Sequence, residues 1–163
     1  MNKIILASGL MSLVGFGFMS QDKIKDCLPE YIEKAQIAIQ EQELSNTQLV
    51  EALIQVESSG KEDCVGDKHL IVPSIGVLQI RPIMVREVNR ILKKLGDNKR
   101  YTNKDRYSRV KSIEMFNVWK DFHHKDHSDE IIARCWNGGP KGWKRKKTLH
   151  YWDKVQKVLK KIT

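Results

Sequence analysis

The sequence predicts a mainly α-helical protein: a single helical domain with a small β element. Apolar residues recur at helical spacing along most of the chain, and Gly or Pro stands where these runs end. One short apolar stretch, residues 75–80, is too brief for a helix and predicts the β element. The length of 163 residues suits one compact domain, and no repeat or low-complexity linker divides it. We expect this domain to occupy residues 21–163.

The first 20 residues have the pattern of a secretory signal. Lys3 precedes an uncharged apolar run that extends from Ile4 to Met19. The run is slightly short for a membrane-spanning helix, although an uncleaved N-terminal anchor is the alternative. We therefore expect residues 1–20 to be a signal peptide. The domain would then be exported to the periplasm or the extracellular side, with no stable membrane insertion after cleavage.

The helices are predicted in chain order from apolar periodicity and end signals. An apolar face from Lys23 to about Glu43 predicts the first helix. The capping-box pattern Ser45-Asn46-Thr47-Gln48 predicts the start of a second helix, which Gly60 ends. Residues 61–75 and 97–107 are predicted to be polar connections. The remaining helices are predicted over residues 82–96, 110–124, 129–136 and 148–162.

The charge balance indicates an anionic partner. Lys and Arg number 29 and Asp and Glu number 20, which gives a formal net charge of +9. Nucleic acid, an acidic membrane and an acidic polysaccharide all fit this excess. A basic cluster interleaved with Trp143 resembles a nucleic-acid patch; it comprises Lys141, Lys144, Arg145, Lys146 and Lys147. Because export argues against DNA and RNA, we expect an anionic wall glycan as the partner, no nucleic acid, and a monomer.

The cysteines and histidines give no metal-binding signature. Three cysteines allow one disulfide plus a thiol, or three thiols: Cys27, Cys64 and Cys135. No C-x-x-C is present, and no His-Glu-x-x-His accompanies the cluster formed by His123, His124 and His127. We expect these histidines to form a solvated polar face, and we expect no metal and no cofactor.

Glu57 is the candidate catalytic acid. It lies in Glu57-Ser58-Ser59-Gly60, at the C-terminal end of an apolar helix. The negative end of the helix dipole disfavours ionisation of a carboxyl there, and desolvation by Leu53 and Val56 would raise its pKa further. A general acid needs such a raised pKa to stay protonated near neutral pH. Taken alone, the segment also fits a solvated Glu at a helix end.

Two further segments carry candidate substrate-binding residues. In Gly76-Val77-Leu78-Gln79, the glycine permits an unusual backbone dihedral angle or a close backbone approach. The Gln79 side chain places an amide donor and acceptor among apolar neighbours. Trp136-Asn137 places an aromatic ring beside an amide near a helix end, which suits sugar binding. Each segment alone also fits an ordinary structural role, as a short strand with one outward Gln or as a core Trp followed by turn-forming glycines.

Together, the order and content of the three segments resemble the soluble lytic transglycosylase family, whose lysozyme-like fold is shared with goose-type lysozymes. That family has a helix ending in Glu-Ser, a Gly-Leu-Met-Gln-like turn usually followed by Pro, and Ala-Tyr-Asn-x-Gly. Here the matching segments are Glu57-Ser58, Gly76-Val77-Leu78-Gln79 with Pro82, and Cys135-Trp136-Asn137-Gly138-Gly139. Trp136 replaces the usual Tyr, Gly138 the commoner Ala, and Val77-Leu78 the Leu-Met pair.

The resemblance implies an α+β lysozyme-like fold with its β element beside an active-site cleft, and cleavage of the β-1,4 bond between N-acetylmuramic acid and N-acetylglucosamine in peptidoglycan. It implies that Glu57 is the general acid and base and that a 1,6-anhydromuramic end is formed. It also implies that the substrate is bound by Ser58, Gly76, Gln79, Trp136 and Asn137.

Two other functions stay open at this stage. A hydrolytic muramidase needs a second carboxylate across the cleft to activate water. Asp67 is the candidate, because Gly66-Asp67 resembles the Gly-Asp of goose-type lysozymes, and Asp63 is another. Arg81, however, stands where a goose-type Asp is expected after the Gln turn. The remaining alternative is a non-catalytic cell-wall-binding or phage structural module.

Overall fold

A computed structural model describes residues 21–162, without the side chains of residues 21–30, 41, 42, 44 and 45. The predicted signal peptide, residues 1–20, lies outside the described residues. The chain divides into two compact units, residues 1–44 and 45–163. None of the helices formed by residues 21–162 combines the length and apolar character needed to cross a bilayer. The prediction that residues 21–163 form one domain stays a prediction.

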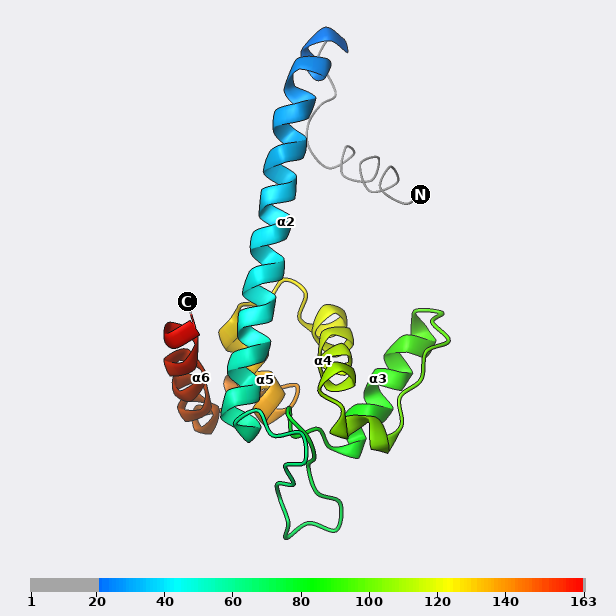
Figure 1. The fold of residues 1–163 in the computed structure, drawn as a ribbon, viewed down its shortest axis with the longest axis vertical. Coiled ribbons are helices and arrows are strands. Elements are labelled where there is room, and N and C mark those ends of the chain that lie inside the picture. The colour runs from blue at the N-terminus through cyan, green and yellow to red at the C-terminus, as the bar shows by residue number, and fades with distance from the viewer. Residues whose placement is uncertain (1–20, 163) are drawn as a thin grey trace. The chain divides into compact units, whose positions relative to one another are not determined.

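The described chain is helical, as predicted from its periodicity (Figure 1). The α-helices are α2 (Gln21–Ser58), α3 (Pro82–Lys94), α4 (Arg109–His123), α5 (Asp129–Gly138) and α6 (Leu149–Ile162). Short 3₁₀ turns connect them: η1 (Asn103–Tyr107), η2 (Gly142–Lys144) and η3 (Lys146–Thr148). In the first unit, α2 carries exposed apolar side chains at Ile32, Ile37 and Ile39.

The prediction of two helices before residue 60 is wrong, because α2 continues from Gln21 to Ser58 without a break. The chain has neither Gly nor Pro between Glu43 and Asn46, so the backbone hydrogen bonds have no reason to stop there. A capping-box pattern is compatible with a helix interior when the residues before it are also helix formers. The end signal was read correctly, because Ser59 and Gly60 both have positive φ, 54° and 81°.

The β element predicted at residues 75–80 is not present as a strand. In the described chain, two isolated bridges occur in this region, Val65 with Ile75 and Ile75 with Ile80. The second bridge closes a turn, since the amide of Ile75 donates to the Ile80 carbonyl at 3.1 Å and the reverse bond is 2.9 Å. The apolar residues of this stretch are buried because it folds back on itself against the core, and not because it extends in a sheet.

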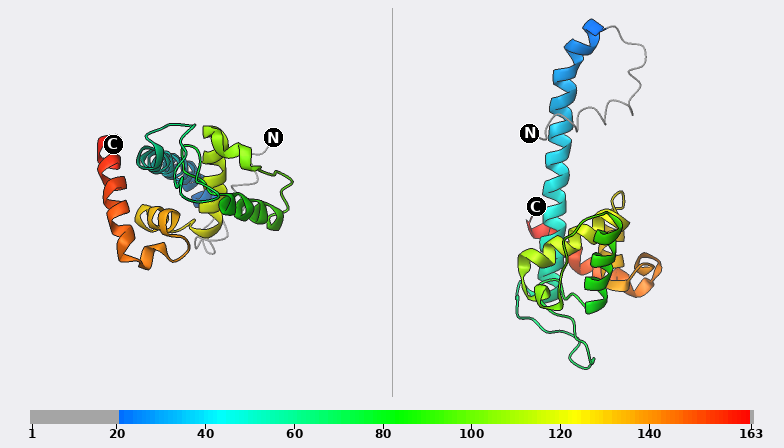
Figure 2. Two further views of the ribbon diagram at one scale, coloured as in Figure 1. Left: turned by 90° about the horizontal axis from the view of Figure 1, so that it is seen from below. Right: turned by 90° about the vertical axis from the view of Figure 1, so that its right-hand side faces the viewer.

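The unit of residues 45–163 has one hydrophobic core. The C-terminal part of α2 contributes fully buried side chains, among them Leu49, Leu53 and Ile54. The turn at Val77-Leu78 and one face of each of α3, α4, α5 and α6 complete this core. Helix α3 packs against α4, and α6 packs against α5 (Figures 1 and 2). This packing brings the ends of α2 and α5 and the 74–80 turn to one cleft.

Candidate active site

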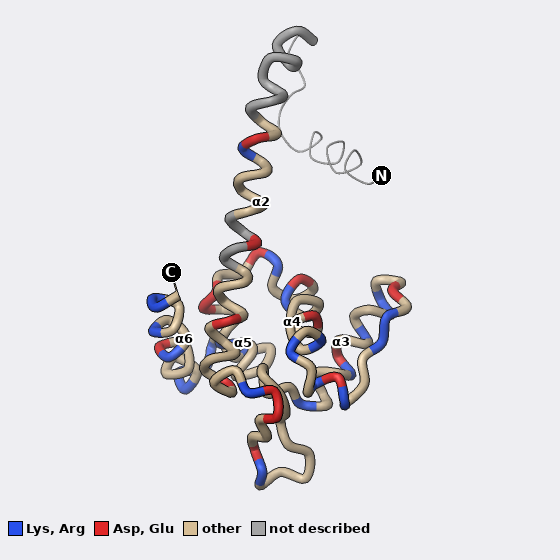
Figure 3. The backbone as a smooth tube through the Cα atoms, in the orientation of Figure 1, with Lys and Arg blue, Asp and Glu red and all other residues tan. Residues whose placement is uncertain are grey.

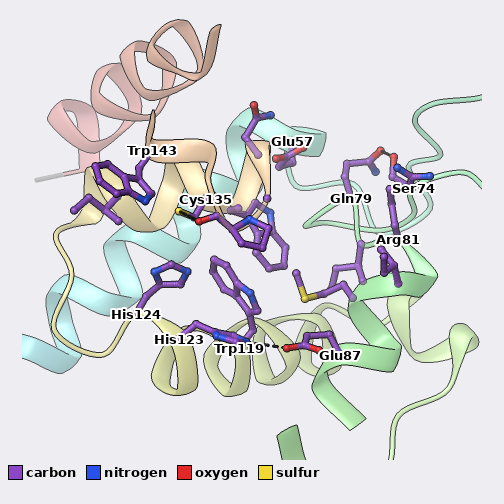
Figure 4. Close-up of a pocket in the computed structure, with 18 of the residues that line it drawn as sticks. Glu57, Ser74, Gln79, Arg81, Glu87, Trp119, His123, His124, Cys135 and Trp143 are labelled. Atoms are coloured by element: carbon purple, nitrogen blue, oxygen red, sulfur yellow. Dashed lines mark hydrogen bonds and ion pairs between the residues drawn. The ribbon is translucent and has the colours of Figure 1, made fainter. Parts of the chain in front are cut away.

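A cleft of about 990 Å³ contains most of the residues predicted from sequence. Glu57, Asp67, Gln79, Trp136 and Asn137 all line it, whereas Ser58 and Gly76 do not. Side chains from α3 and α4 and the loop after α5 supply the rest of the wall. Figure 4 shows Glu57 close to the turn that bears Gln79, with the His124 ring on the other side of the cleft.

Glu57 occupies the last turn of α2 and is half-buried. The Tyr151 hydroxyl, from α6, donates a hydrogen bond of 2.7 Å to Glu57 Oε1. This bond fixes the carboxyl plane. Among the described residues Oε2 has no hydrogen-bond partner in the protein, so the second oxygen is available to a ligand in the cleft. One oxygen is therefore held and the other is free for proton transfer.

Burial raises the pKa of Glu57 from 4.5 to about 7. The hydrogen bond from Tyr151 lowers this pKa because it stabilises the carboxylate, and the charge of Asp67 raises it. Desolvation exceeds the effect of the hydrogen bond. The sequence argument gave the correct direction and named desolvation as one cause, but it could not identify Tyr151 or the effect of Asp67. A pKa close to ambient pH lets one carboxyl serve as both acid and base.

Ser58 has a structural position in place of the predicted contact with substrate. It is buried, and its hydroxyl lies 2.9 Å from the Val77 carbonyl and 3.2 Å from the Ile54 carbonyl. The bond to Val77 ties the end of α2 to the turn that carries Gln79. Ser58 therefore positions two parts of the site relative to each other.

Gly76 makes close backbone packing possible. Its φ is +81°, and a Cβ at this position would lie 1.9 Å from the Arg106 carbonyl oxygen. The Arg106 guanidinium donates from Nη1 to the carbonyls of Pro73 and Ile80 at 3.2 and 3.1 Å. Gly76 and Arg106 together hold the turn in place from the side away from the cleft.

Gln79 lines the cleft, but its amide is engaged by the protein. Its Nε2 donates to the Gly76 carbonyl at 2.8 Å and to the Cys64 carbonyl at 3.1 Å. Its Oε1 lies 3.0 Å from Ser74 Oγ, and its φ of +47° is unusual for a residue with a side chain. These bonds fix the orientation of the Gln79 amide at the cleft.

Asp67 also places a carboxylate at the cleft, as Glu87 does. It is exposed, has φ of +46°, and its Oδ2 lies 3.2 Å from Ser74 Oγ. A Cβ at Gly66 would lie 2.1 Å from Gln79 Oε1 and 2.8 Å from Ser74 Oγ, so a side chain there would displace the Gln79 amide. The 64–67 segment is thereby packed against the 74–79 turn. Asp67 and Glu57 line the same cleft, and the charge of Asp67 raises the pKa of Glu57.

The aromatic wall of the cleft is formed by α4 and α5. The half-buried Trp136 ring packs edge-on against Phe116 and Trp119, each with ring centroids 5.1 Å away. Asn137, next along α5, is exposed. Trp136 is therefore fixed by its neighbours and also borders the cleft.

The prediction that the three histidines form a solvated face is wrong for His124. This side chain is buried, its ring packs 4.6 Å from that of Trp119, and its Nδ1 lies 3.0 Å from Nδ1 of His127. Burial, followed by the neighbouring histidines, lowers the pKa of His124 to about 4. His123 is instead exposed and pairs with Glu87 at 2.8 Å.

Sequence reasoning missed the residues that reach the site through tertiary packing. Tyr151 lies 94 positions after Glu57, and nothing local marks its hydroxyl as a partner of that carboxylate. Trp119 and Glu87 also line the cleft without belonging to any motif. A buried Tyr in an amphipathic helix, whose hydroxyl must find a partner, was the one available signal.

The cysteines of the described side chains form no disulfide with one another. Cys64 and Cys135 are free thiols, while the Cys27 side chain lies outside the described residues. In the part of the chain with described side chains, no three His, Cys, Asp or Glu residues are arranged to hold a metal ion.

Solved structures that resemble the chain include lysozyme complexes. A chain in the crystal structure of Aeromonas hydrophila PliI with Meretrix lusoria lysozyme is 20% identical, with a TM-score of 0.56. The match covers 68% of this chain and 88% of that one. A structure of inhibitor-bound lysozyme from Meretrix lusoria gives the same values. This likeness shows a lysozyme-related fold. No protein-family profile matches the chain. No curated protein matches it either.

Proposed function

We propose that this protein is a peptidoglycan lytic transglycosylase of the soluble type, with Glu57 as its general acid and base. The observation that carries the proposal is the environment of Glu57: a half-buried carboxyl with a pKa of about 7, held through one oxygen by Tyr151, and open to a large cleft through the other. A cleft of this size can accept several sugar rings, and Trp136 offers an aromatic face for one of them.

In this mechanism the protonated Glu57 gives its proton to the glycosidic oxygen as the bond from that oxygen to C1 of the muramic sugar breaks. The substrate's own N-acetyl group stabilises the electron-poor C1, which removes the need for a second protein carboxylate. The C6 hydroxyl oxygen then bonds to C1, and its proton returns to Glu57. The products are a 1,6-anhydromuramic end and a new N-acetylglucosamine end, and Glu57 is again protonated.

The other predicted residues take supporting roles in this proposal. Trp136 and Asn137 contact the sugars from α5, and Gln79 presents a fixed amide. Ser58 and Gly76 act through the turn, because they pack behind it and do not line the cleft. Tyr151 positions Glu57 and keeps its pKa from rising beyond the useful range.

Export belongs to the same proposal. Peptidoglycan lies outside the cytoplasmic membrane, so the enzyme would act in the periplasm or at the cell surface after removal of residues 1–20. We propose a monomer that needs no cofactor and does not bind nucleic acid in its cellular role.

The test compares the wild type with Glu57→Gln in clearing a suspension of purified sacculi. The matched control is Glu62→Gln, an exposed carboxylate five positions later. We expect Glu57→Gln to lose activity by more than about a thousandfold and the control to keep it. If the wild type and Glu57→Gln clear the suspension equally slowly, the protein is a non-catalytic wall-binding module and the proposal is wrong.

A hydrolytic muramidase is the second candidate, and the presence of Asp67 in the cleft favours it. In that reaction Asp67 would activate a water molecule. Asp67→Asn tests it, since a hydrolase would lose most of its activity, whereas a transglycosylase that uses the substrate's N-acetyl group would keep it. Arg81, which also lines the cleft, replaces the acidic residue expected of goose-type lysozymes.

A further inference from the structure

The net charge of the protein is concentrated in one segment. Residues 141–161 contain nine of the 29 Lys and Arg residues and one of the 20 Asp and Glu residues, Asp153. This segment therefore carries nearly all of the formal charge of +9, and the rest of the chain is almost neutral. Figure 3 shows the lysines of α6 as the blue positions along that helix.

The segment is fixed next to the cleft. Gly142 packs so closely on α5 that a Cβ would lie 2.0 Å from the Arg134 carbonyl oxygen. The Thr148 hydroxyl lies 2.8 Å from the Gly142 carbonyl and accepts a bond from Arg134 Nε at 3.1 Å. Pro140 and Trp143 line the cleft, so the basic segment begins at its wall.

The basic side chains of this segment are exposed, and none forms an ion pair within residues 31–162. They are Lys141, Lys144, Arg145, Lys146, Lys147, Lys154, Lys157, Lys160 and Lys161. Like charges at i, i+3 and i, i+4, as at Lys154, Lys157 and Lys161, destabilise a helix. The helix dipole stabilises only the positive charges in the last turn, at Lys160 and Lys161. The concentration of charge therefore opposes folding of this segment, and an external anion would offset the repulsion.

We propose that residues 141–161 form a basic surface that binds the peptide carboxylates of the peptidoglycan strand whose sugars occupy the cleft. This inference rests on the proposed function and extends it. The strand carries anionic peptides along its length, and the surface is likewise extended, since α6 alone is roughly 21 Å long. Eight of the nine cations are Lys, which attract carboxylates as point charges and do not demand bidentate geometry.

The consequence is a preference for strands that carry their peptides. Sugar contacts in the cleft would set the register of the peptidoglycan strand. The basic surface would attract the strand electrostatically, which raises the association rate and depends on salt concentration. Trp143 belongs to the basic segment and also lines the cleft, and Lys144 Nζ lies 4.8 Å from its ring centroid.

The test uses the full chain with Glu57→Gln, so that binding is measured without turnover. The first set of substitutions combines Lys146→Gln, Lys154→Gln and Lys157→Gln. The second set is the control and combines Lys93→Gln, Lys104→Gln and Lys125→Gln. The second set is equally exposed and equally charged but lies outside the segment. Co-sedimentation is measured with intact sacculi and with sacculi whose peptide carboxylates have been converted to neutral amides with a carbodiimide and ammonium, at low and high salt.

We expect the first set to bind intact sacculi about tenfold more weakly at low salt and the second set less than twofold more weakly. The difference should vanish at high salt and on sacculi with amidated carboxylates. Equal loss in both sets, or a loss that persists on sacculi with amidated carboxylates, would overturn the proposal. Stronger competition by duplex DNA than by polyglutamate would also overturn it and indicate a phosphate-backbone partner.

Failure of this inference is distinguishable from failure of the proposed function. If the wild type clears sacculi but both sets of variants bind equally, the proposed function stands and the proposed basic surface is wrong. If the wild type does not clear sacculi but the two sets of variants bind as expected, the proposed basic surface stands and the proposed function is wrong.

Discussion

Replacing Glu57 by Gln should stabilise the folded protein at neutral and alkaline pH. The pKa of Glu57 is raised from 4.5 in the unfolded chain to about 7 in the folded one. Below pH 4.5 the carboxyl is neutral in both states and contributes no difference. Between those values the unfolded state loses its proton while the folded state keeps it, so wild-type stability falls as pH rises.

The size of the effect follows from the shift. A difference of roughly 2.5 pKa units corresponds to about 3 kcal/mol, reached near pH 7 and constant above it. Gln keeps an oxygen that accepts the Tyr151 hydrogen bond, so the comparison isolates the charge. Urea unfolding of the wild type and Glu57→Gln at about pH 5 and about pH 8 gives the two free energies of unfolding.

We expect the variant to be more stable by about 3 kcal/mol at the higher pH and by less than about 1 kcal/mol at the lower. Glu62→Gln, at an exposed position, should change stability by less than about 0.5 kcal/mol at either pH. A Glu57→Gln variant that is less stable than the wild type at high pH would refute the reasoning, because the carboxylate would then be stabilised in the folded state.

Three other predictions concern Tyr151, Gly76 and His124. Tyr151→Phe should lower the maximal clearing rate and move the alkaline limb of its pH profile up by about one unit, because the lost hydrogen bond had lowered the pKa of Glu57; Tyr107→Phe, at an exposed position, should do neither. Gly76→Ala should cost more than about 3 kcal/mol in urea unfolding, whereas Gly96→Ala, also at positive φ but in open space, should cost about 1 kcal/mol. NMR titration of the His124 ring should give a pKa near 4, with stability lost as pH falls from 6.5 towards 4; a value near 6.5 would contradict its burial.

Local patterns predicted the parts of the fold that depend on local physics. Pro82 begins α3, Gly96 follows its end with φ of +74°, and Gly138-Gly139 ends α5, all as expected from Pro and Gly preferences. The continuity of α2 was not predicted, since a capping pattern at residue 45 says nothing about whether the preceding turn continues. The 75–80 stretch folds into a turn because Arg106 and Gly76 hold it, and neither contact has a local signal.

The candidate site divides in the same way. Glu57, Gln79, Trp136 and Asn137 were found because each belongs to a short segment with recognisable chemistry, and all four line the cleft. Tyr151 could not be found, because its relation to Glu57 exists only after α6 packs on α5.

The most direct test of the catalytic account is mass spectrometry of the products from purified sacculi digested by the wild type and by Glu57→Gln. We predict muropeptides with 1,6-anhydromuramic ends from the wild type and none from the variant. Reducing muramic ends from the wild type would contradict the transglycosylase mechanism and identify a hydrolase. Equal product from both proteins would contradict the role of Glu57.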